Sequence, residues 1–92
     1  MGLNLFHEVD GGATIRGDGI DIEITVRNIG VNGKVKTAQV EVDYHPGNRY
    51  FDLDGVKDVE ISENILVGLT RNRRVKSNLV SLCYSCPMRY RI

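Results

Sequence analysis

The chain has 92 residues, of which 41% are hydrophobic and 26% are charged, and 12 Lys and Arg side chains balance 12 Asp and Glu side chains. This composition is typical of a folded domain and argues against a disordered chain, collagen or a disulfide scaffold. The length fits a single domain, residues 1–92. No apolar segment is long enough to span a bilayer, and the N-terminus lacks a basic and then apolar leader. We therefore expect a soluble, cytoplasmic protein with no membrane contact.

The balanced net charge hides a division along the sequence. Residues 1–65 carry all 12 acidic side chains and six basic ones, whereas residues 66–92 carry basic side chains alone: Arg71, Arg73, Arg74, Lys76, Arg89 and Arg91. This basic C-terminal extension predicts either a surface for RNA or an acidic protein partner, or a segment that lies against the acidic part of the chain. Because so short a chain encloses a small core, we also expect a homodimer.

Alternating apolar and polar residues predict strands near the N-terminus. A short strand is expected at residues 3–7 and another at residues 13–16. The sequence Asp10-Gly11-Gly12 between them is typical of a turn, because aspartate and glycine adopt the backbone angles that turns require.

The clearest alternation runs from Ile20 to Val26, where β-branched residues fill one face and polar residues the other. A second alternating segment covers residues 37–44. Between these segments lies Asn32-Gly33, a residue pair suited to the two central positions of a tight hairpin turn. Residues 20–44 therefore predict one long antiparallel hairpin with a polar face and an apolar face.

Proline and glycine interrupt this pattern at residues 45–48. The apolar side chains that follow, Tyr50, Phe51 and Leu53, are expected to return to the core, and a weaker strand is expected at residues 56–61. Ser62 has the character of a helix N-cap, with a hydrophobic residue on either side at the spacing of a staple. We therefore predict a helix of about two turns at residues 63–70, although glycine at position 68 disfavours it.

The last segment of the sequence, residues 79–92, again has the pattern of a β-strand. Residues 79–84 form a dense apolar run, and Met88, Tyr90 and Ile92 alternate with Arg89 and Arg91. The expected fold class is therefore mostly β, either all-β or β with one short helix. We expect a small antiparallel sheet or barrel-like meander, in an intertwined homodimer.

The order of these motifs resembles the carbon storage regulator family, small bacterial proteins that bind messenger-RNA leaders. The resemblance is carried by Ile15-Arg16-Gly17-Asp18, by the alternating strand up to Val26, and by the Asn32-Gly33 hairpin. His45-Pro46 stands where the family has Ala-Pro, and residues 61–65 stand where its helix begins. The resemblance covers the first half of the chain only, and residues 1–65 are taken as the part with the strands and helix start of that family. It implies five-stranded protomers that intertwine, so that a twin subunit completes the apolar side of the sheet and two RNA sites form.

The departures from the family pattern fall on its RNA site. The family contacts RNA through an arginine at the end of the first strand and another before the helix, but His7 and Ser62 occupy these positions here. A neutral imidazole lacks the permanent charge and the two-pronged donation of arginine. The candidate RNA-binding residues are therefore Leu5, His7, Arg71, Arg73, Arg74, Lys76, Arg89 and Arg91, with Tyr84 or Tyr90 available for base stacking.

The sequence Cys83-Tyr84-Ser85-Cys86 has the spacing of half a zinc site. His7 and His45 could complete a Cys2His2 site if the fold brought them close. The alternative is that both cysteines are small apolar residues of a strand, with no metal and no cofactor.

No nucleophile, base or glycine-rich phosphate loop stands at a useful spacing, so we predict that the protein is not an enzyme. The leading hypothesis is an RNA-binding post-transcriptional regulator that blocks single-stranded leaders. The alternative is a protein-interaction module, a small inhibitor or adaptor that keeps the scaffold without binding RNA.

Overall fold

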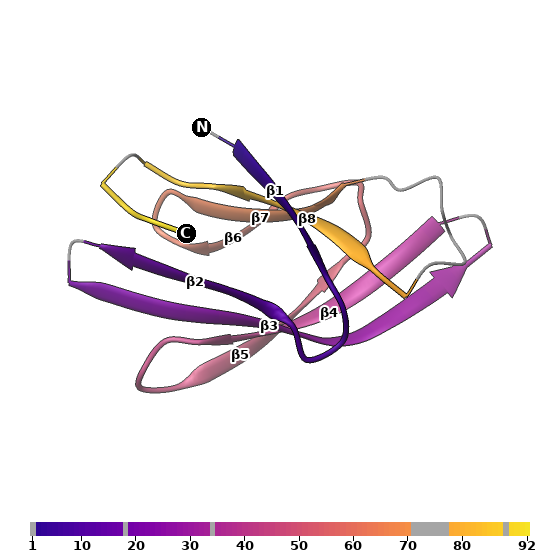
Figure 1. Ribbon diagram of the computed structural model, residues 1–92, viewed down its shortest axis with the longest axis horizontal. Coiled ribbons are helices and arrows are strands. Elements are labelled where there is room, and N and C mark those ends of the chain that lie inside the picture. The colour runs from indigo at the N-terminus through magenta and orange to yellow at the C-terminus, as the bar shows by residue number, and fades with distance from the viewer. Residues whose placement is uncertain (1, 18, 34, 71–77, 88) are drawn as a thin grey trace.

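The computed structural model describes residues 2–17, 19–33, 35–70, 78–87 and 89–92, and all regular structure in these residues is β-strand. The strands form two four-stranded antiparallel sheets (Figure 1). Sheet A has the order β1-β8-β7-β6, and sheet B has the order β2-β3-β4-β5. The strand bounds are β1 Gly2–His7, β2 Gly12–Gly17, β3 Ile20–Asn32, β4 Val35–Asp43, β5 Asn48–Leu53, β6 Val59–Ser62, β7 Ile65–Thr70 and β8 Val80–Ser85. The expectation of a mostly β fold is confirmed, in its all-β form.

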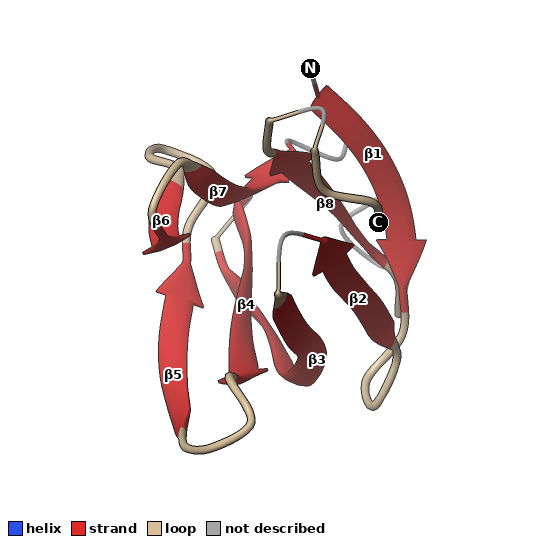
Figure 2. Ribbon diagram, turned by 90° about the vertical axis from the view of Figure 1, so that its left-hand side faces the viewer, coloured by secondary structure: helices blue, strands red, loops and turns tan. Residues whose placement is uncertain are grey.

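The two sheets stack as the layers of a sandwich, and the core lies between them (Figure 2). Sheet B contributes the inward side chains of its strands, and sheet A contributes those of β7 and β8. The largest fully buried side chains include Ile15, Ile24, Val40, Leu53, Ile65, Val67, Val80, Leu82 and Tyr84. Burial of each large apolar side chain stabilises the fold by about 1.5–3 kcal/mol. Sheet A of the same chain therefore covers the apolar face of the hairpin that the family resemblance assigned to a twin subunit.

The long hairpin forms as the alternation predicts. Ile22, Ile24 and Val26 of β3 are buried, and Ala38, Val40 and Val42 of β4 are buried opposite them. A bulge between Val26 and Asn28 shifts the register, so apolar residues reach the core again further along β3. Asn32 pairs with Val35, which places Gly33, with a φ of 66°, at the first turn position. The turn therefore begins one residue later than predicted.

The predicted helix at residues 63–70 is wrong. Ser62 ends β6 and is no helix cap, and β7 runs from Ile65 to Thr70 after a tight turn in which Asn64 has a φ of 63°. Asparagine tolerates this left-handed conformation, so Glu63-Asn64 connects two strands. Ile65, Val67 and Leu69 are buried at every second position because one face of β7 packs into the core, and β8 and β6 pair with β7 on either side. Pairing with β6 through this tight turn, and with β8 further along the chain, decides the conformation of residues 65–70.

Two further expectations about the C-terminal part need correction. Residues 66–92, treated above as an extension, include β8 and all of β7 except its first residue, Ile65, and these are the two inner strands of sheet A. The expected final strand is reduced to one bridge, in which Arg91 and Arg16 exchange backbone hydrogen bonds of 2.8 and 2.6 Å. Met88 lies outside the described residues. The C-terminal segment therefore adds to the edge of β2 in sheet B.

Polar side chains connect the two sheets at two places. Lys36 projects inward from β4, and its Nζ donates a hydrogen bond of 2.7 Å to the carbonyl of Leu79, just before β8. The hydroxyl of Tyr44, after β4, donates a hydrogen bond of 2.6 Å to the carbonyl of Ile61 in β6. These bonds connect Lys36 and Tyr44, in and beside β4, to backbone carbonyls in or next to strands of sheet A.

Candidate functional site

His7, the candidate at the end of β1, does not face solvent. Its side chain is 9% exposed, and its Nε2 lies 2.8 Å from the hydroxyl of Tyr84 in β8. The two rings meet edge to face at a centroid distance of 5.9 Å. Burial lowers the pKa of His7 and raises that of Tyr84, so both groups stay neutral near pH 7. Leu5, on the same face of β1, is half-buried against the core. The pair of His7 and Tyr84 therefore offers no cation to RNA.

The predicted basic residues are only partly described. Arg71, Arg73, Arg74 and Lys76 lie outside the described residues. The guanidinium carbon of Arg89 lies 5.0 Å from the centre of the Tyr90 ring, and Arg91 is anchored through its backbone to β2. Tyr84 and Tyr90, proposed above for base stacking, are both buried. The structure thus places neither aromatic ring on a stacking surface.

The outer face of sheet B carries a network of paired charges. Nη1 of Arg27 lies 3.1 Å from Asp10, and its Nε lies 2.8 Å from Glu41. The amide of Asn48 and the guanidinium of Arg27 lower the pKa of Glu41. Arg16 lies 3.6 Å from Asp21 on the same face. These contacts leave the arginines of this face with intramolecular carboxylate partners.

The four residues of the hypothetical zinc site are not brought together. Cys83 projects from the outer face of β8, whereas His7 points into the core from the neighbouring strand β1. His45 lies beyond β4 in sheet B, with its Nδ1 3.5 Å from Asp43. Cys86 is half-buried, and both cysteines are free thiols. Within the described residues, no group of three or more His, Cys, Asp and Glu side chains could hold a metal ion.

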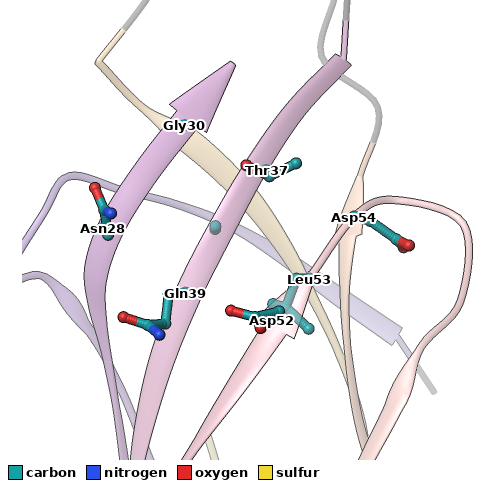
Figure 3. Close-up of a pocket in the computed structure, with 8 residues that line it drawn as sticks. Asn28, Gly30, Thr37, Gln39, Asp52, Leu53 and Asp54 are labelled. Atoms are coloured by element: carbon teal, nitrogen blue, oxygen red, sulfur yellow. The ribbon is translucent and has the colours of Figure 1, made fainter. Parts of the chain in front are cut away.

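A shallow groove of about 340 Å³ lies on the outer face of sheet B, beside the bulge of β3 (Figure 3). Asn28, Gln39 and Asp52 stand side by side on β3, β4 and β5, and Asp54 follows β5. The backbone N–H of Val56 donates to the Asp54 carboxylate and lowers its pKa. The groove presents hydrogen-bonding groups without a nucleophile beside a base, so it offers surface contacts and no catalytic arrangement.

The edges of the sheets differ in how they are protected from another strand. β2 is bridged by Arg91, and β6 has only four residues, with a register irregularity before Ser62. β5 carries Arg49 and Asp52. Charges, short length, irregular pairing and a covering segment all discourage pairing with a further strand. Three of the four edges thus carry at least one protective feature.

Within the part of the chain that the structure describes, β1 carries none of these features. Its six residues include no Asp, Glu, Lys, Arg or Pro, and its pairing with β8 is continuous from Gly2–Ser85 to His7–Val80. No described strand pairs with its other side. Phe6 is 64% exposed and Leu3 is 43% exposed. The edge of β1 therefore combines unpaired backbone groups with exposed apolar side chains.

Comparison with known protein families, curated proteins and solved structures finds no match to this chain. The described residues contain no helix with the length and apolarity needed to cross a membrane. The functional proposal below therefore rests on the arrangement of the described residues.

Proposed function

We propose that this protein is a non-enzymatic protein-interaction module that binds an extended segment of its partner along the edge of β1. The observation that carries this proposal is that no described residue protects the edge of β1, whereas the other three edges are protected. A strand added there would extend sheet A and satisfy backbone N–H and C=O groups that β8 does not reach.

The side chains of β1 supply contact area for such a partner strand. Phe6 stands on the outer face of sheet A and Leu3 on the opposite face, so an added strand would contact apolar side chains on both sides. Each favourable cross-strand pair contributes about 0.2–1 kcal/mol, and the backbone bonds add to this. A partner segment with apolar residues on both faces fits best.

The charge distribution of the described residues favours a protein over RNA. The arginines on the outer face of sheet B have carboxylate partners, and the same face carries Glu23 and Asp43 near His45. RNA binding draws most of its affinity from cations that contact phosphates. Carboxylates on this face would repel phosphates, whereas an uncharged strand at β1 meets no such repulsion.

The test is a selection of random peptides displayed on phage, followed by titration of a selected peptide into the labelled protein. We expect shifts of the backbone amide signals of β1 and loss of binding in Phe6→Lys, which places a charge on the edge. The matched control is Tyr50→Lys, on the edge strand β5, where the tyrosine is 57% exposed. It should bind the peptide as the wild type does.

A parallel titration with a fluorescent single-stranded RNA at two salt concentrations tests the competing class. Binding that weakens steeply with salt, together with peptide binding that maps away from β1, would overturn the proposal. Absence of RNA binding together with peptide binding at β1 supports it.

A further inference from the structure

We propose that the strand that occupies the β1 edge is β1 of a second copy of this chain, so that two sandwiches share one continuous sheet. This inference rests on the proposed function, because it names the partner of the same edge. Antiparallel pairing of β1 with itself about a two-fold axis would join sheet A of each copy into an eight-stranded sheet.

The side chains of β1 select one register for this pairing. A two-fold axis perpendicular to the sheet keeps each face continuous, so residues pair with others of the same face. With the axis at Asn4, Leu3 stands opposite Leu5 of the second copy, and Phe6 stands opposite Gly2 of the second copy. The aromatic ring then covers a residue without a side chain, an arrangement known to stabilise glycine at sheet edges.

The neighbouring registers of self-pairing leave an exposed apolar side chain of β1 without a suitable partner. With the axis at Leu5, Leu3 would stand opposite His7, whose ring is turned into its own core and bonded to Tyr84. With the axis at Leu3, Phe6 has no partner within the strand. Only the register centred on Asn4 covers Leu3 and Phe6, the exposed apolar residues of β1.

The lack of charged side chains on β1 favours an uncharged strand, such as a copy of β1 itself, over a charged partner. β1 carries no Asp, Glu, Lys or Arg, so two copies meet without like-charge repulsion. The contact involves a short strand from each copy, and it belongs to the small, weak class of interfaces. We therefore expect a dimer that dissociates on dilution.

Disulfide cross-linking tests the register. In the β1–β8 pair, Asn4 stands opposite Cys83, so the native cysteines are first replaced in a Cys83→Ser, Cys86→Ser background. Asn4→Cys in this background should form a covalent dimer under mild oxidation, because the substituted positions of two copies face each other. Gly2→Cys is the control, since it faces Phe6 of the second copy, and it should remain largely monomeric.

Sedimentation of the wild type over a wide concentration range tests the dimer without cysteine variants. Phe6→Lys should weaken the dimer about tenfold or more, because the aromatic contact is lost twice by symmetry. The control Val56→Lys changes a side chain that is 72% exposed between β5 and β6, and it should leave the dimer unchanged.

The outcomes separate this inference from the proposed function. A protein that stays monomeric at every concentration, yet binds selected peptides at β1, overturns the self-pairing and leaves the interaction module standing. A dimer that survives Phe6→Lys, or that cross-links through Gly2→Cys as well as through Asn4→Cys, also overturns it. Cross-linking at Asn4 alone, with a dimer weakened by Phe6→Lys, supports it.

Discussion

Sheet A and sheet B share one core but present different surfaces to their surroundings. The strands of sheet B carry nine Asp, Glu, Lys and Arg side chains, whereas those of sheet A carry one, Glu60. Several charges of sheet B pair with each other, while sheet A ends in an uncharged edge strand. The zero net charge of the chain therefore hides an uneven division of charge between the two sheets. Charged edge strands discourage pairing with a further strand, whereas an uncharged edge does not.

The largest effect is expected in the core that the sheets share. Leu82 of β8 is fully buried, so Leu82→Ala should lower the free energy of unfolding by about 2–5 kcal/mol. Ser85→Ala, on the outer face of the same strand, should change it by less than about 0.5 kcal/mol. Urea unfolding of both variants measures the difference. Equal losses would contradict the assignment of inner and outer faces in sheet A.

A second substitution sharpens the description of the outer face of sheet A. A Cβ at Gly68 in β7 would overlap Oδ1 of Asp58, because the carboxylate occupies that space. Gly68→Ala should destabilise the protein by about 1–3 kcal/mol in thermal or urea unfolding. Adding Asp58→Ala should restore most of this loss. Gly2→Ala on the same face meets only ordinary contacts and should have little effect.

The buried pair of His7 and Tyr84 makes the stability of sheet A depend on pH. Burial lowers the pKa of His7 in the folded state, so between its ordinary value of about 6.5 and the folded value the unfolded chain binds more protons. Stability should therefore be fully present above the ordinary pKa and fall as the pH drops below it. Urea midpoints measured from pH 7.5 downwards, at about half-unit steps, would show this decline.

Two variants identify the group responsible for this decline. His7→Gln removes the titrating ring and should flatten the profile in the mildly acidic range. His45→Gln removes an exposed histidine of sheet B and should leave the decline in place. A decline that persists in His7→Gln would contradict the assignment.

The smallest effect is expected on the charged face of sheet B. Arg27 contacts Asp10 and Glu41, but all three side chains border solvent, where an ion pair contributes little. Arg27→Gln should lower the unfolding temperature slightly at low salt and not measurably at high salt. A large loss that salt does not reduce would show that these pairs stabilise the fold more than their exposure allows.

The sequence predicts the hairpin of β3 and β4 well, because its signal is local. Alternating β-branched residues and a glycine turn stand within one stretch of chain, and burial of Ile22, Ile24 and Val26 follows directly. The sequence misassigns β7 for the opposite reason. Ser62 and the staple-like spacing around it are compatible with a helix, and pairing with β8 on one side and β6 on the other makes residues 65–70 a strand.

The candidate site was less predictable than the fold. His7 was selected by its place in a family pattern, but its burial depends on Tyr84, which lies 77 positions further along the chain. The sequence alone shows that residues 2–7 contain no Asp, Glu, Lys or Arg. Its meaning depends on β8 pairing with one side of β1 and leaving the other unpaired, and such distant pairing is not encoded in local periodicity.

Hydrogen exchange of backbone amides, measured in dilute and in concentrated protein, is the most direct test of whether β1 pairs with β1 of a second copy. We expect that the amides of Gly2–His7 that point away from β8 become more protected as concentration rises, while those of the edge strands β5 and β6 keep the same exchange rates. Unchanged exchange in β1, or concentration-dependent protection in β5 or β6, would contradict it.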